Sequence, residues 1–151
     1  MKKVVLFIGV LLCTLIVNAQ NLKQIDDIYY QGSELYSGTY KTYHDNGKVD
    51  TEMKVKQGKK CGKTKIYFED GQLHEIRAFK NNEMHGKWEM YNNKSILISI
   101  ARYKKGKKHG KWIIWNDQGN LLYKLQYRNG EKVGVWKNYD GEGNLVNKRK
   151  Y

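Results

Sequence analysis

The chain has 151 residues with no proline, two cysteines, and 28 lysines and arginines against 15 acids, for a formal charge of +13. This length suits one domain and no more, and the excess of positive charge favours association with anionic partners. The cysteine count excludes a disulfide-rich scaffold.

Residues 1–19 have the pattern of a cleaved signal peptide. Two lysines precede an apolar run over residues 4–17, and small residues then fit a cleavage site before Gln20. The run is too short to span a bilayer, so an uncleaved anchor and a lipid attached to Cys13 are the weaker alternatives. We therefore expect an exported protein, located in the periplasm, in the cell envelope or outside the cell.

Removal of this segment leaves Cys61 as the only cysteine, so we expect no internal disulfide. Cys61 fits either an intermolecular bond or, more simply, a small residue tolerated before a repeat glycine. For an exported protein, the available anions are lipid head groups, acidic glycans and acidic proteins. We expect no nucleic acid among the partners.

A period of 24 residues dominates the sequence from residue 38 to residue 151, after an imperfect lead-in over residues 20–37 that we expect to cap the array. Each repeat starts at a glycine and keeps the chemistry of three later positions. The glycines are Gly38, Gly62, Gly86, Gly110 and Gly134. Two places later stand Tyr40, Thr64, Trp88, Trp112 and Trp136, five places later Tyr43, Tyr67, Tyr91, Trp115 and Tyr139, and eleven places later Val49, Leu73, Leu97, Leu121 and Leu145.

Each repeat is predicted to form two strands. In the first strand of the fourth repeat, Trp112 and Ile114 share one face and Lys111 faces the other way. Asn-Gly and Asp-Gly sequences supply the positive φ angles of the turns inside repeats, and in the third repeat an asparagine of the segment 92–94 takes this conformation.

The loops between repeats are also short, and strands joined by tight turns must pair with their sequence neighbours. The predicted fold is therefore all-β, a single-layer antiparallel meander of five 24-residue hairpin repeats. Because a lone hairpin is not stable in water, we expect each Trp or Tyr to pack against its equivalent in the next repeat.

The residues that carry this pattern make the sequence resemble a MORN-repeat protein, and more narrowly the variant repeats of the YwqK-type antitoxin family. The motif is a basic, glycine-containing loop followed by Gly-Lys-Trp and another aromatic residue, as in residues 107–115 and 82–91. The resemblance covers residues 38–145. It implies a protein that neutralises a toxin, or a scaffold for proteins or phospholipids, and it brings no catalytic residue.

Residues typical of catalytic and metal sites do not fall in productive patterns. His85 and His109 hold equivalent places, but equivalent residues lie about 9.6 Å apart, too far to share one zinc ion. The turn acids lack the alternating pattern of a calcium loop, and the serines have no evident base. We therefore expect no enzyme activity, no metal and no cofactor.

Two groups of residues are candidates for binding a partner. The first is a row of loop lysines predicted to line one edge of the sheet, which would contact anionic lipid or glycan, or would only solubilise the sheet and block end-on pairing. The second is an exposed aromatic stripe for a protein partner, although such ladders also serve packing. The lysines are Lys59, Lys60, Lys104, Lys105, Lys107 and Lys108, and the aromatic residues are Trp115 and Tyr139.

Overall fold

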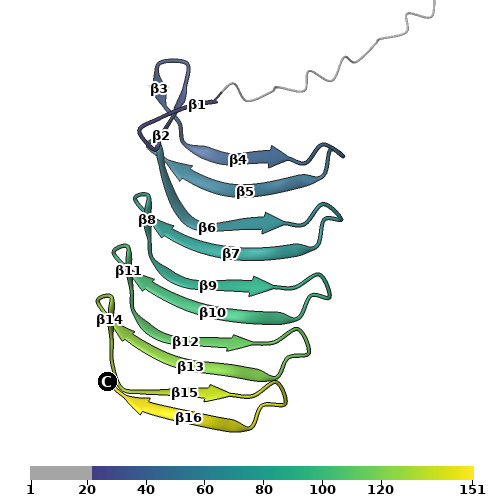
Figure 1. Ribbon diagram of the computed structural model, residues 1–151. Helices are drawn as coiled ribbons and strands as arrows, with labels where there is room; N and C mark the ends of the chain where they lie inside the picture. The colour runs from purple at the N-terminus through teal and green to yellow at the C-terminus, as the bar shows by residue number, and fades with distance from the viewer. Residues whose placement is uncertain (1–21) are drawn as a thin grey trace, which may run out of the picture.

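The structure, a computed structural model, describes residues 22–151, and in that part of the chain it consists of strands joined by turns (Figure 1). The predicted signal peptide lies outside the described residues. Among residues 22–151, no helix has the length and apolar character needed to cross a membrane.

A small sheet formed by the lead-in precedes a large one formed by the repeats. The small sheet contains β1 (Leu22–Ile25), β2 (Ile28–Gln31) and β3 (Glu34–Leu35). The large sheet contains β4 (Gly38–Tyr43), β5 (Val49–Lys56), β6 (Lys59–Tyr67), β7 (Leu73–Lys80), β8 (Glu83–Met84), β9 (Gly86–Tyr91), β10 (Leu97–Lys104), β11 (Lys107–Lys108), β12 (Gly110–Trp115), β13 (Leu121–Arg128), β14 (Glu131–Lys132), β15 (Val135–Tyr139) and β16 (Leu145–Lys150).

The large sheet has 13 strands, and its main path follows the chain from β4 at one end to β16 at the other. Every pairing is antiparallel, and the short strands β8, β11 and β14 pair with β7, β10 and β13 next to the loops between repeats (Figure 1). These features confirm the single-layer antiparallel meander of five hairpin repeats.

The turns inside repeats and the turns between repeats have positive φ angles at different positions. Inside repeats, the residue with positive φ is the last of the turn, such as Gly47 at 80°. In the third repeat this residue is Ser95, at 59°, so the prediction that an asparagine takes this conformation was wrong. Between repeats, both turn residues have positive φ, as in Asn81 and Asn82. Such two-residue turns match the twist of the strands that they join.

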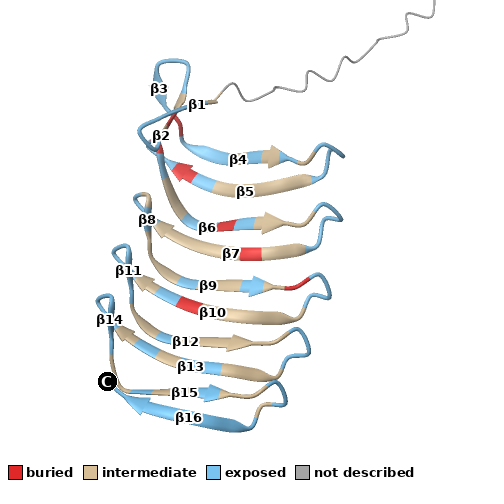
Figure 2. Ribbon diagram, viewed as in Figure 1, coloured by how far each residue is buried: buried red, intermediate tan, exposed pale blue. Residues whose placement is uncertain are grey.

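The lead-in packs against the first repeat and forms the best-buried part of the described chain. Tyr29, Tyr36 and Val55 make one hydrophobic cluster, and their exposed fractions are 5%, 7% and 4%. The amide of Tyr29 donates to the carbonyl of Gly58 over 2.9 Å, which ties the small sheet to the first loop between repeats. Burial then declines along the array, and Ala101 is the last buried residue in the described part (Figure 2).

An aromatic ladder runs along one side of the large sheet, with a different order from the one predicted. Each Trp packs between aromatic residues of the neighbouring second strands, and not against the equivalent Trp. Trp112 lies between Tyr103 and Tyr127, with ring centroids 5.3 and 5.2 Å apart. The prediction failed because the second strand of each hairpin lies between equivalent first strands. The full ladder is Phe79, Trp88, Tyr103, Trp112, Tyr127, Trp136 and Tyr151.

Candidate binding surfaces

The large sheet has two faces of different chemistry, because successive side chains of a strand point to opposite sides. We call the side that carries Trp88, Trp112 and Trp136 the aromatic face. We call the opposite side, which carries Lys111 next to Trp112, the basic face. The two faces and the edge formed by the loops between repeats are described in turn below.

Hydrogen bonds hold the indole rings of the aromatic face in place. The Nε1–H of Trp112 donates to the carbonyl of Arg102 over 3.1 Å, and the backbone N–H of His109 donates to the same oxygen over 2.9 Å. Trp88 and Trp136 repeat this arrangement one repeat earlier and one later. Because these rings have fixed orientations, they present a rigid surface.

The ladder tyrosines are partly shielded from water. Burial raises the pKa of Tyr103 above its ordinary value, although the nearby guanidinium of Arg77 opposes this shift. Burial also raises the pKa of Tyr127, and the neighbouring Tyr151 adds to the effect. Both hydroxyls therefore stay protonated at neutral pH and can donate to a partner.

Some of the predicted loop lysines belong to the aromatic face. The Nζ of Lys108 lies 4.7 Å from the ring centroid of Trp112 and 5.1 Å from that of Tyr127. Lys60 covers Phe79 in the same manner at 5.4 Å. A cation over a ring face is attracted by the quadrupole of the ring, so these two lysines support the ladder.

The remaining predicted lysines lie at the loop edge. Lys59, Lys104, Lys105 and Lys107 are exposed, and the loops between repeats all fall on the same side of the sheet (Figure 1). The structure thus divides the predicted lysine row into a part that packs on rings and a part that faces solvent.

The predicted aromatic pair lies on the basic face. Trp115 follows Ile114 at the end of β12, and Tyr139 ends β15, so both lie near the turns inside repeats, at the far end of the strands from the loop lysines. Both are half-buried. The structure therefore does not bring Trp115 and Tyr139 together with the lysine edge.

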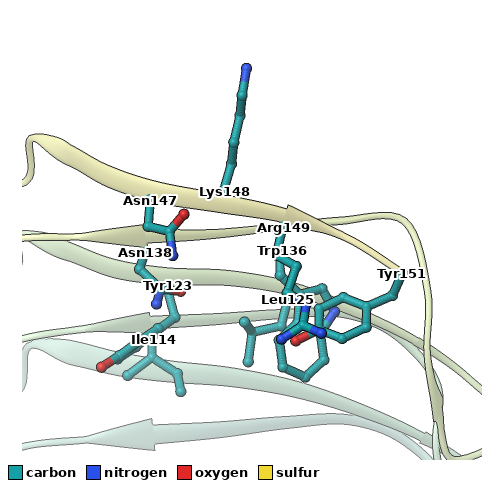
Figure 3. Close-up of a pocket in the computed structure, with 9 residues that line it drawn as sticks. All are labelled: Ile114, Tyr123, Leu125, Trp136, Asn138, Asn147, Lys148, Arg149 and Tyr151. Carbon is teal, nitrogen blue, oxygen red and sulfur yellow. The ribbon is translucent and has the colours of Figure 1, made fainter.

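A shallow hollow of about 460 Å³ opens on the aromatic face near the end of the array. Tyr123, Leu125, Trp136, Arg149 and Tyr151 line it, and their side chains point to the same side of the sheet (Figure 3). Tyr123 and Tyr151 are 39% and 41% exposed. The hollow combines apolar surface with a guanidinium and phenol hydroxyls, which suits a protein surface better than a small polar substrate.

The basic face carries a row of lysines that the sequence pattern alone did not indicate. Lys124 pairs directly with Lys137, and Lys137 pairs directly with Lys148, across three adjacent strands. The strands β12, β13, β15 and β16 contain no aspartate or glutamate. In the sequence, Lys124 and Lys148 stand fourteen places after a repeat glycine, and Lys137 stands three places after one. Only the strand register shows that these positions are neighbours.

The equivalent row at the start of the array contains an acid between two lysines. Glu52 lies opposite Lys41 on one side and Lys65 on the other, and the Lys41 Nζ is 3.0 Å from a Glu52 carboxylate oxygen. Like charges directly opposite in a sheet repel, and opposite charges attract. The lysine row near the end of the array is therefore an electrostatically unsatisfied surface.

Titratable residues that suggested metal chemistry have structural roles. The His109 ring accepts the backbone N–H of Asn129 at Nδ1 over 3.4 Å, and the backbone N–H groups of His85 and His109 donate to carbonyls of the preceding strand over 2.9 Å. Asp140 accepts hydrogen bonds from the backbone and side-chain amides of Asn144, which hold its pKa below the ordinary value. Within residues 22–151, no group of three or more His, Cys, Asp or Glu side chains is placed to hold a metal ion.

Comparison with known families now adds to this geometry. Residues 36–57, 60–81 and 108–129 match the sequence profile described as MORN repeat variant. Three of the five repeats are similar to this variant. Each matched segment begins two residues before a repeat glycine and spans one hairpin, so the profile and the structure define the same unit. A comparison with curated proteins finds no match.

Proposed function

We propose that the protein is a non-enzymatic binding module that holds a protein partner on its aromatic face. The observation that carries this proposal is the hollow lined by Tyr123, Trp136, Arg149 and Tyr151, on a ladder whose rings are fixed by hydrogen bonds. Tyr, Trp and Arg are the residues that most often dominate binding at protein interfaces. MORN repeats, moreover, are commonly modules that bind proteins or membranes.

The resemblance to antitoxins refines this proposal. In this view the protein is exported, requires no cofactor, and neutralises a toxin that it meets in the cell envelope or outside the cell. The regular repeats support a role without catalysis, because uniform stacking leaves shallow surfaces in place of the enclosed pocket that catalysis prefers.

The test is crosslinked affinity capture with the full chain, from the envelope fraction and the medium of cells that express it. Tyr123→Glu places a charge in the hollow without removing a ladder ring, and Tyr43→Glu, the same change at an exposed position of β4 outside the hollow, is the matched control. We expect one protein in stoichiometric amount with the wild type and the control, and its loss with Tyr123→Glu. Equal capture by all three forms contradicts the proposal.

A second function is favoured by the exposed loop edge. Lys59, Lys104, Lys105 and Lys107 would hold an anionic lipid or glycan surface, at about 1 kcal/mol per charge near acidic lipid. Replacement of these four lysines by glutamine should then remove binding to anionic vesicles. Binding that persists in about 1 M salt, where screening acts within about 3 Å, contradicts this function.

A further inference from the structure

The last strand of the large sheet has one unoccupied side. Within residues 22–151, β16 pairs with β15 and with no other strand, and all six of its residues are exposed (Figures 1 and 2). An exposed strand edge is a template on which another extended chain can pair.

The hydrogen-bond pattern shows which backbone groups of β16 are free to pair. Gly134 and Tyr151 exchange two backbone hydrogen bonds, of 3.1 and 2.8 Å. In an antiparallel ladder such hydrogen-bonded pairs alternate with pairs that make none. The register from Val135–Lys150 to Asn138–Asn147 has no shift. The N–H and C=O groups of Lys148 and Lys150 therefore point away from β15, toward the open edge.

The side chains at these positions lie on the basic face. Figure 3 shows Lys148 projecting from the opposite side of the sheet to the residues of the hollow. Lys148 ends the lysine row that starts at Lys124 and continues through Lys137. A chain paired with β16 would thus place one side chain directly opposite Lys148 and, two residues away, another opposite Lys150.

The chain itself shows what chemistry suits that place. At the start of the array, the residue between two lysines of the equivalent row is Glu52. A carboxylate opposite Lys148 would supply the same alternation at the end of the array. We propose that β16 binds an extended acidic segment of a partner protein as an additional antiparallel strand, with carboxylates at alternate positions opposite Lys148 and Lys150.

Two other roles for these lysines explain fewer of the observations. The lysines could protect the strand edge, or β16 could pair with β16 of a second copy. Lysines on an edge strand prevent unwanted pairing, but Lys137 and Lys124 lie one and two strands inside the edge, where they protect nothing. A second copy paired through β16 would bring the basic segment 148–150 against itself, and like charges opposite one another repel. The acidic partner satisfies both the open backbone groups and the row.

The inference rests on the proposed protein-binding function and names the partner segment. The probe is a short labelled peptide of alternating threonine and glutamate, titrated with the full chain in a fluorescence anisotropy assay. Combining Lys148→Glu with Lys150→Glu should weaken binding about tenfold or more, because two attractive pairs become repulsive. The same variant should gain affinity for the peptide in which lysine replaces glutamate.

The matched control combines Lys54→Glu with Lys63→Glu, which makes the same charge change on exposed positions of β5 and β6. It should bind the acidic peptide within about twofold of the wild type, since surface charges beyond a Debye length are screened. Thermal unfolding of each variant verifies that the sheet remains folded. An equal loss in both variants would mean a general charge effect and would overturn the inference.

Backbone pairing is tested with methylated peptides. N-methyl groups on the glutamate amides, which face β16 in the proposed register, should abolish binding, whereas N-methyl groups on the threonine amides should not. Equal binding of both peptides overturns strand addition, as does self-association of the protein through β16. If no acidic peptide binds but the aromatic face still captures a protein, this inference is wrong and the proposed function stands. If both assays fail, both proposals are wrong.

Discussion

The two ends of the array have the same backbone fold but differ in how far their side chains are buried and their charges paired. At the start, Tyr29 of the lead-in and Val55 of the first repeat are buried against each other, and Glu52 separates the lysines of its row. At the end, the strands β12, β13, β15 and β16 contain no buried residue and no acid. We therefore expect the start of the array to contribute more to stability and the end to offer more surface for binding.

The aromatic ladder shows the same division. The second repeat has Thr64 where later repeats have Trp, and beside it Arg77 donates to Glu75 over 2.6 Å. Glu75 is itself buried, so its charge is satisfied within the sheet. From the third repeat onward a Trp takes the place of Thr64, and Ser99, Tyr123 and Asn147 take the place of Glu75. Substitutions at equivalent positions of the repeats thus give the two ends of the array different surfaces without changing the fold.

The largest expected effect comes from removing the buried ring by which the lead-in packs on the first repeat. Tyr29→Ala should lower the free energy of unfolding by about 3 kcal/mol, because it leaves a cavity beside Tyr36 and Val55. Tyr151→Ala, at the exposed end of the ladder, should cost about 1 kcal/mol. Urea unfolding of both variants measures the difference. Equal losses would show that the two ends contribute alike to stability.

A pair of glycines isolates the contact between the lead-in and the array. Gly58 and Gly106 occupy equivalent turns with φ of 72° and 74°, so alanine is equally strained at both. At Gly58 a Cβ would lie 2.6 Å from Ile28 Cγ2, whereas at Gly106 it would meet nothing within 4 Å. Gly58→Ala should therefore cost about 2–3 kcal/mol and Gly106→Ala about 1 kcal/mol, measured by thermal unfolding. Equal shifts would exclude a stabilising role for this contact.

The centre of the ladder should be intermediate between the two ends. Trp112→Ala removes contacts with Tyr103 and Tyr127 and the hydrogen bond to Arg102, and should cost about 2 kcal/mol. Trp112→Phe keeps an aromatic ring and loses only the hydrogen bond, so about 1 kcal/mol is expected. Chemical unfolding followed by circular dichroism measures both losses. If the two variants are equally destabilised, the rings contribute little beyond the indole N–H.

The fold was predictable because its determinants are local. The 24-residue period, the turn residues and the short connections leave an antiparallel meander as the only way to pair the strands. The ladder order was not predictable from the period alone. Trp112 faces Leu125 directly and meets Tyr127 diagonally, and this relation depends on the pairing register within the hairpin.

The candidate site was predictable only in part. Loop lysines are visible in the sequence as charge runs, but Lys60 and Lys108 proved to lie over rings. The row through Lys137 crosses from one repeat to the next, so it depends on two-residue turns whose positive φ angles set the register between repeats. Ser95 shows the same limit, because a serine in the left-handed conformation has no sequence signature.

Exchange of charges between the two rows tests the comparison directly and has the smallest expected effect. Lys137→Glu places a carboxylate between Lys124 and Lys148, and should raise the free energy of unfolding by about 0.5–1 kcal/mol. Glu52→Lys makes the reciprocal change at the start of the array and should lower stability. Both effects should shrink in about 1 M salt, which separates charge from packing.

The same variant separates stability from binding. If the lysine row is kept for an acidic partner, Lys137→Glu gains stability and loses affinity for the acidic peptide, because the added carboxylate competes with the peptide for Lys148. Glu52→Lys should leave that affinity unchanged, since it lies at the far end of the sheet. A stabilised variant with unchanged peptide affinity would show that the row contributes nothing to recognition, and the end of the array would then differ from its start in stability alone.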